Sequence, residues 1–164
     1  MSDNTKVAAT EAPNAQRLAE RVQQAMLARD TFSRWLGVEV LDIAPGTCTL
    51  RMTVRSEMLN GFGVAHGGIV FSAADSAFAF ACNTHGRVTV SIENSITYPL
   101  AIREGDVLTA VAREEAASER LGYYRVDVTR QGGELVGLFR GTAYRTLKEH
   151  FPATTAETAV PSPS

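Results

Sequence analysis

The sequence is poor in cysteine and has no long apolar run, and each deficit excludes a class of protein. Two cysteines, Cys48 and Cys82, are too few for a disulfide framework and lack the spacing of metal ligands. No stretch approaches the roughly 18 consecutive apolar residues of a transmembrane helix. Residues 1–15 contain no apolar segment of the signal-peptide type. We therefore expect a cytoplasmic protein without a membrane partner or a bound metal.

Lysine is also scarce, and positive charge is not concentrated anywhere. Of the 16 basic residues 14 are arginines, and they are scattered along the chain without forming a run. The 18 acidic residues bring the net charge to −2 at pH 7. A nucleic-acid-binding domain would carry a basic patch or stripe. We therefore expect no nucleic-acid partner.

Length and apolar content predict one domain with dispensable ends. The chain has 164 residues, of which 45% are apolar, and this is enough for a single core. Residues 1–13 and 149–164 contain few large apolar side chains, so they bury too little surface to offset the entropy of ordering. The sequence predicts a domain over residues 14–148 between a disordered N-terminal tail and a disordered C-terminal tail.

Helical periodicity comes first in the domain, and strand periodicity follows. Leu18, Val22 and Met26 recur at helical spacing, so we expect a helix from residue 14 to 35, or one that breaks at 30–31 before a short second helix. Strict apolar–polar alternation over residues 47–55 predicts a strand. The remaining strands are predicted over residues 38–44, 88–98, 107–115, 123–130 and 135–146, with turns at 45–46 and 131–133.

A second helix is predicted between the two groups of strands. Residues 68–82 are Ala, Phe, Val and Ile on nearly every side, which is typical of a helix enclosed all round. Ser72, Asp75 and Ser76 are its polar side chains, and their spacing places them on one face. This order of elements predicts an α+β fold. An antiparallel sheet of five to six strands wraps around the long central helix, and another helix precedes them.

Asp75 is the strongest single candidate for chemistry. An ionised carboxylate in an apolar setting is costly without partners. Its presence there favours a general base or nucleophile with a shifted pKa, although it could also simply bond to the backbone or face a wet groove. His66, Gly67 and Gly68 open the same helix, where free backbone N–H groups could form an oxyanion hole. A plain tight turn would explain the two glycines equally well.

The distance between these candidates constrains how they could cooperate. Gly67 and Asp75 are eight residues apart, which is about 12 Å along an α-helix. One reacting carbonyl must lie about 3 Å from its oxyanion donors and close to its base. If both groups act in one reaction, they therefore come from different subunits, whose helices face each other across a two-fold axis.

The run from Met58 to Asn83 resembles the hot-dog fold acyl-CoA thioesterases, specifically the phenylacetyl-CoA thioesterase (PaaI) type. The resemblance is carried by Asn60, then His66, Gly67 and Gly68 six residues later, then Asp75 nine residues after His66. The stretches 105–110 and 138–141 agree with it, and it extends over residues 16–146.

The resemblance implies a hot-dog fold and an acyl-CoA thioesterase that needs no cofactor. Its substrate would be phenylacetyl-CoA or a hydroxylated relative, in phenylacetate degradation. It also implies a homodimer that pairs into a homotetramer, with sites at the dimer interface. The implied site residues are Asp75 as general base or nucleophile, Gly67 as oxyanion donor, His66 as support of the loop, Asn60 as holder of thioester or water, and Gly68, Phe62 and Met58 as substrate contacts.

One family feature and two other functions stay open. Relatives carry a Ser or Thr on the following strand, and here Glu93, Asn94, Ser95 and Thr97 occupy that region without one being singled out. A hot-dog hydratase or dehydratase is an alternative, but its Asp-x₄-His spacing is missing from the sequence. The other alternative is a non-catalytic acyl-CoA-binding module, and Asp75 inside the helix favours turnover over it.

Overall fold

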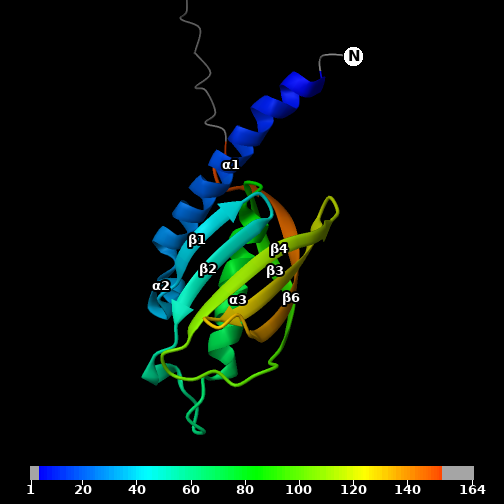
Figure 1. The fold of residues 1–164 in the computed structure, drawn as a ribbon. Coiled ribbons are helices and arrows are strands. Elements are labelled where there is room, and N and C mark those ends of the chain that lie inside the picture. Colours follow the sequence, from blue (N-terminus) through cyan, green and yellow to red (C-terminus); the bar gives the residue numbers. More distant parts are fainter. Residues whose placement is uncertain (1–3, 153–164) are drawn as a thin grey trace, which may run out of the picture.

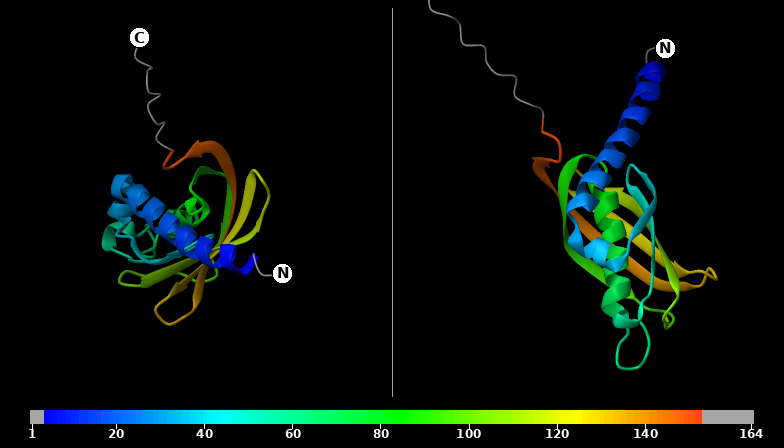
Figure 2. Two further views of the ribbon diagram at one scale, coloured as in Figure 1. Left: turned by 90° about the horizontal axis from the view of Figure 1, so that it is seen from above. Right: turned by 90° about the vertical axis from the view of Figure 1, so that its left-hand side faces the viewer.

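A curved antiparallel sheet wraps around one central helix, as predicted. The computed structural model describes residues 4–152, apart from the side chains of residues 4–12. Within this range six strands lie in one sheet around α3 (Gly67–Asn83) (Figure 1). The view along the helix shows the sheet curling around it (Figure 2). In spatial order the strands are β1 (Glu39–Ala44), β2 (Thr47–Thr53), β4 (Val107–Ala117), β5 (Leu121–Arg130), β6 (Leu135–Glu149) and β3 (Arg87–Thr97).

Alternation along the strands explains why one face of the sheet is buried. In β2 the side chains of Cys48, Leu50 and Met52 are buried, while the intervening residues are partly or fully exposed. The β4 partners of these three residues in the register, Ala112, Ala110 and Leu108, are buried as well. Because side chains of a strand alternate between faces, this match lines the concave face with apolar groups. That face receives α3.

Helix α3 is held in the sheet by aromatic packing. The ring of Phe78 lies 5.3 Å from that of Tyr124 on β5 and 5.6 Å from that of Phe139 on β6, measured between centroids. Gly141 on β6 makes room for this ring, because a Cβ there would lie 2.9 Å from Phe78 Cζ. Such interlocked aromatic contacts fix the height and rotation of the helix against the sheet.

The N-terminal helical region breaks where the second of the two predicted alternatives puts it. Helix α1 (Asn4–Arg29) ends before Asp30, and α2 (Thr31–Leu36) follows. Asp30 caps α2 by accepting a hydrogen bond from Ser33 N–H, and Gly37 ends it with φ +78°. An Asp at the start and a left-handed glycine at the end are the usual helix boundaries. Over residues 4–152, no helix is long and apolar enough to span a bilayer.

Helix and strand structure is described on both sides of the predicted domain of residues 14–148. Helix α1 begins at Asn4. At the other end β6 continues to Glu149, and His150 N–H donates to Gly86 O. The His150 ring also bonds to Asn83 Oδ1 at 2.7 Å. Residues 1–3 and 153–164 lie outside the described residues, so the predicted tails stay a prediction there.

Candidate active site

Asp75 lies halfway along α3 and is only partly exposed. Burial raises the pKa of its carboxyl group above the ordinary value, and a hydrogen bond from Asn94 works in the opposite direction. In that bond Asn94 Nδ2 donates to Asp75 Oδ1 at 2.9 Å. Desolvation is the larger effect, so Asp75 is a carboxylate whose basicity is increased by its surroundings.

Asn94 connects the edge strand β3 to this carboxylate. It is one of four candidates that the sequence left open, and it points toward the helix, whereas Glu93, Ser95 and Thr97 are exposed. Its Oδ1 is buried and has no hydrogen-bond partner among the described residues. The sequence could not select Asn94, because the choice depends on which face of β3 turns inward past the irregularity between Ser91 and Glu93.

Beyond its first turn, α3 is open to solvent along one narrow stripe. From residue 72 to 83 only Ser72, Asp75 and Ala79 are partly exposed, and the rest are buried. We call these three residues the open stripe of α3. Ser76 does not share it, contrary to the predicted common face, because its Oγ bonds to Ser33 Oγ of α2 at 2.9 Å. Asp75 is thus the one acidic group on the open stripe.

The start of α3 leaves one backbone donor free. His66 caps the helix, and its Nδ1 accepts a 3.0 Å hydrogen bond from Gly68 N–H. The Gly68 amide is therefore engaged, whereas Gly67 N–H has no acceptor among the described residues. A free N–H at a helix N-terminus carries partial positive charge and attracts an oxygen that develops negative charge. Gly67, not Gly68, is the available donor.

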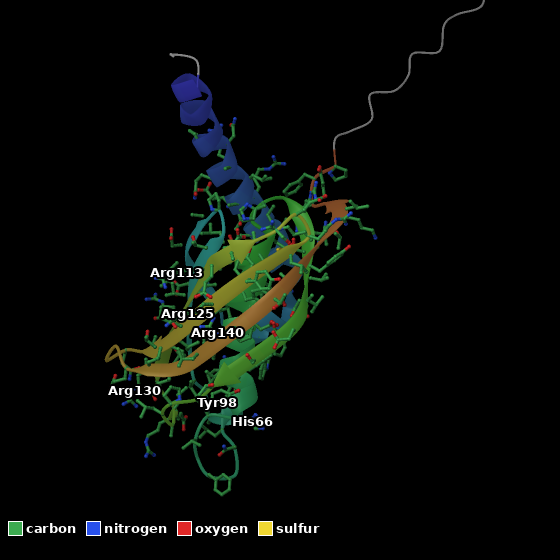
Figure 3. All side chains as sticks on the ribbon, turned by 90° about the vertical axis from the view of Figure 1, so that its right-hand side faces the viewer. His66, Tyr98, Arg113, Arg125, Arg130 and Arg140 are labelled. Atoms are coloured by element: carbon green, nitrogen blue, oxygen red, sulfur yellow. The ribbon has the colours of Figure 1, made fainter. Side chains whose placement is uncertain are left out.

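Tyr98, one residue past β3, lies against Gly67 and was missed by the sequence analysis. Its hydroxyl donates to Gly67 O at 2.9 Å. Figure 3 shows Tyr98 and His66 together at the end of the molecule where α3 begins. The proline after Tyr98 indicates only the end of a strand, so no local pattern pointed to this contact.

A cavity of about 320 Å³ opens beside Gly67 and Tyr98. Apart from these two residues its lining is apolar and comes from the loop before α3, the helix itself and the segment after β3. The other lining residues are Val64, Ala65, Val70, Pro99, Leu100, Ala101 and Ile102. An apolar cavity next to a free backbone donor suits a ligand with an apolar body and a carbonyl group.

The loop before α3 contains three predicted site residues in different roles. Asn60 Oδ1 accepts hydrogen bonds from Phe62 N–H at 2.9 Å and from Val64 N–H at 3.5 Å, so this side chain shapes the loop. Its Nδ2 has no hydrogen-bond partner among the described residues. Phe62 is 93% exposed at the tip of the loop, which projects below the sheet in Figure 1. Met58 is 2% exposed and packs in the core, and its contact with substrate stays a prediction.

These features supply the groups that hydrolysis of a carbonyl compound needs, but Asp75 and Gly67 of one chain are too far apart to act on the same carbonyl group. Asp75 could activate water or attack, and Gly67 N–H could stabilise a carbonyl oxygen. Along α3 their separation is about 12 Å, so one carbonyl cannot contact both groups of one chain. Among residues 13–152, no three His, Cys, Asp or Glu side chains gather as metal ligands would.

Comparison with known proteins identifies the family of this chain. Residues 62–137 match the Thioesterase superfamily. The chain is 36% identical over 121 residues to the acyl-coenzyme A thioesterase PaaI of Escherichia coli (strain K12), which covers 74% of this chain and 86% of that protein.

Solved structures extend the similarity to the whole fold. The structure of E. coli PaaI, from the phenylacetic acid degradation operon, superposes with a TM-score of 0.81 at 33% identity, covering 82% of this chain and 98% of that one. A hypothetical thioesterase protein from Streptococcus pneumoniae TIGR4, solved with coenzyme A, superposes with a TM-score of 0.66 at 27% identity, covering 68% and 88%. On this evidence the chain belongs to the thioesterase superfamily and has its hot-dog fold.

Proposed function

We propose that this protein hydrolyses acyl-CoA thioesters to a free acid and CoA. The observation that carries the proposal is Asp75, a carboxyl group of raised pKa on the open stripe of an otherwise buried helix. A basic carboxylate in a water-poor site suits attack on an electrophilic carbonyl. Support also comes from a relative named acyl-coenzyme A thioesterase and a structural neighbour solved with coenzyme A.

The reaction needs only groups that the chain has. As a general base, the Asp75 carboxylate takes a proton from water while the water oxygen attacks the thioester carbon; as a nucleophile, it attacks that carbon itself and forms an acyl–aspartyl anhydride, which water then hydrolyses to the free acid. In both routes the C–S bond breaks, and the thiolate leaves and takes up a proton that comes from the water. Gly67 N–H donates to the carbonyl oxygen as it gains negative charge. The free amide nitrogen of Asn60 is available to hold the thioester or the water. A thiolate leaves readily, so we propose hydrolysis without a cofactor.

The site is proposed to form between two subunits. Asp75 of one subunit would face Gly67 of its partner, because about 12 Å of helix separates these residues within one chain. Two features beside Asp75 support such a partner. One is the open stripe of α3, and the other is β3, an edge strand of 11 residues with exposed Val90 and Ile92. A long unpaired strand edge is a template for pairing with a second copy. We further propose that two such dimers pair.

The acyl group is proposed to be arylacetyl, with phenylacetyl-CoA or a hydroxylated relative as the first substrate to test. The apolar cavity beside Gly67 has room for an aromatic ring. Phe62 is exposed in the single chain and close in sequence to Gly67, so it is proposed to contact the substrate or to cover it from the partner subunit. The alternative acyl groups are short or medium alkyl chains.

A panel of acyl-CoA substrates followed by thiol release tests the activity. We expect turnover of at least one substrate and the highest kcat/KM for phenylacetyl-CoA or a hydroxylated relative. Highest kcat/KM for an alkyl substrate would overturn the acyl assignment and leave the hydrolysis standing. No thiol release above the uncatalysed rate with any substrate would overturn the proposed reaction.

Complementation between inactive variants tests the shared site. We would co-express Asp75→Asn with Gly67→Val and choose a substrate on which each variant alone has no measurable activity. Valine is used because its branched side chain fills more of the space in front of the backbone donor than the methyl group of alanine does. In a two-fold dimer with shared sites, a mixed pair has one doubly altered site and one intact site. Random mixing therefore restores about a quarter of the parent activity. If each site lies within one subunit, mixing restores nothing. Thermal unfolding of each variant checks that it is folded.

A further inference from the structure

Tyr98 contacts Gly67 in two independent ways. Its hydroxyl donates to Gly67 O at 2.9 Å. Its ring also lies over the Gly67 backbone, because a Cβ on Gly67 would be 3.2 Å from Tyr98 Cζ and 3.4 Å from Cε2. The second contact fixes the position of the α-carbon, and the first fixes the orientation of the peptide group that follows it.

The Gly67–Gly68 peptide group is held at both of its polar atoms. Tyr98 binds the carbonyl oxygen, and His66 Nδ1 accepts from the N–H of Gly68 at 3.0 Å. Two consecutive glycines have more backbone freedom than any other pair of residues, and a helix start made of them is loosely defined by its own sequence. The free N–H of Gly67 belongs to the preceding His66–Gly67 peptide group, whose carbonyl oxygen accepts from Ile69 N–H at 2.9 Å. The two peptide groups share the Gly67 α-carbon, so the Tyr98 contacts with that α-carbon and with Gly67 O restrict the direction of the N–H from its other side.

We propose that Tyr98 is a positioning residue that holds the Gly67 N–H in line for the carbonyl oxygen of the substrate. The inference rests on the proposed thioester hydrolysis and adds a residue to it. An oxyanion donor is effective only when its direction is set before the reaction, since reorientation during the reaction would cost part of the stabilisation. Tyr98 supplies that restraint while the glycines leave the surface open to the substrate.

Strand β3 then aligns both halves of the site. Asn94 contacts Asp75, and Tyr98, four residues later, contacts Gly67. Four residues of a strand span about 13 Å, and the eight residues from Gly67 to Asp75 span about 12 Å of helix. The strand and the helix run in opposite directions with matching spans. Strand β3 and the residue that follows it therefore contact both the helix residue with the carboxylate and the one with the backbone donor in each subunit.

The hydroxyl of Tyr98 keeps its proton as a hydrogen-bond donor. Burial raises the pKa of this phenol above its ordinary value, so at neutral pH it is protonated and can donate to Gly67 O.

Replacing Tyr98 by phenylalanine tests the proposal, because it removes the hydroxyl and keeps the ring. We expect kcat to fall about fivefold to tenfold, which is the effect on a rate of losing one hydrogen bond. KM should stay within twofold of the parent. Equal losses in kcat and kcat/KM identify an interaction that acts in the transition state. Tyr98→Leu removes the ring contact as well, and its kcat should fall further.

Tyr123→Phe is the matched control. Tyr123 is 44% exposed against 45% for Tyr98, and its hydroxyl makes no hydrogen bond to any described residue. This variant should keep the parent kcat and KM. As a readout independent of turnover, ¹⁵N relaxation should show lower order parameters at the Gly67 and Gly68 amides in Tyr98→Phe and unchanged ones in Tyr123→Phe.

The outcomes separate this inference from the proposed function. A parent enzyme inactive on every acyl-CoA would overturn the function, and the relaxation data would still report whether Tyr98 orders the glycines. An active parent whose Tyr98→Phe variant keeps its kcat would overturn the positioning role alone. Tyr98→Phe could also lose kcat because it is less stable. If its unfolding temperature falls while the order parameters of the Gly67 and Gly68 amides in the folded protein are unchanged, the positioning role is overturned as well.

Discussion

Asn94 Nδ2 donates a 2.9 Å hydrogen bond to Asp75 Oδ1 and thereby links the edge strand to the central helix. Burial raises the pKa of Asp75 by disfavouring the ionised carboxylate, and the hydrogen bond from Asn94 lowers this pKa by a smaller amount. The carboxylate is left more basic than an exposed one but still oriented by a donor. That balance is what a general base or nucleophile requires, since it must be ionised and reactive at the same pH.

Asp75→Asn should reduce kcat by about 10³-fold, because the change removes the reactive carboxylate and keeps the shape of the side chain. Thiol release from the best acyl-CoA substrate measures this loss. Ser72→Ala, on the same stripe one turn earlier, is the control and should stay within a few-fold of the parent. Activity of Asp75→Asn within tenfold of the parent would remove Asp75 from the mechanism.

In a plot of kcat/KM against pH, Asn94→Ala should move the fall in activity on the acid side (the acid limb) to higher pH. The hydrogen bond from Asn94 lowers the pKa of Asp75, so its loss leaves the desolvation unopposed and the pKa rises further. Because the ionised form is the active one, activity falls as pH drops through this pKa. Ser95→Ala, whose side chain points to the outer face, should leave the limb in place. An unchanged limb in Asn94→Ala would mean that Asp75 does not control it.

Asp75→Asn should also unfold at higher urea concentration than the parent at neutral pH. Burial raises the pKa of Asp75 in the folded protein, so folding favours the neutral carboxyl, and that stability is lost as pH rises through the folded pKa. Asparagine is neutral at every pH. The difference in free energy of unfolding should therefore be largest where Asp75 is fully ionised in the folded protein and shrink as pH falls through its raised folded pKa, at fixed protein concentration. A difference that does not vary with pH would contradict this account.

Gly67→Ala should lower kcat by about tenfold. The new methyl group would lie 3.2 Å from the Tyr98 ring and displace it, which misdirects the backbone donor. The loss is smaller than the 10²–10³ of a deleted oxyanion donor, because the N–H is retained. Gly61→Ala in the loop before α3 is the control, since a Cβ there meets nothing within 4 Å. Equal kinetics for the two variants would show that the space over Gly67 is not needed.

Gly141→Ala should lower the free energy of unfolding by about 1–3 kcal/mol, as overpacking of a core does. The added Cβ would lie 2.9 Å from Phe78 Cζ and 3.0 Å from both Phe139 Cε1 and Asn94 Oδ1. Urea unfolding measures the loss. The contact with Asn94 means that kcat should fall as well, in protein that is still folded. Stability equal to that of Gly61→Ala would show that β6 moves aside freely.

Much of the fold could be predicted from local pattern. Alternation at Cys48, Leu50 and Met52 identified β2 and its buried face, and the apolar run over residues 68–82 identified α3. The contacts of His150, two residues beyond the predicted end of the domain, could not be predicted from local pattern. Its contacts with Asn83 and Gly86 are polar and far away in sequence, so no hydrophobic pattern marks them.

Local patterns of residues were enough to place the elements in order, to identify the enclosed helix, and to locate Asp75 and Gly67 on it, because spacing along a helix converts directly into distance. The contacts of Asn94 with Asp75 and of Tyr98 with Gly67, and the burial of Met58 beside the exposed Phe62, became visible in the folded chain alone. The two contacts join residues 19 and 31 positions apart in the chain. Their existence depends on how β3 is registered and rotated against α3, which no local pattern of residues specifies.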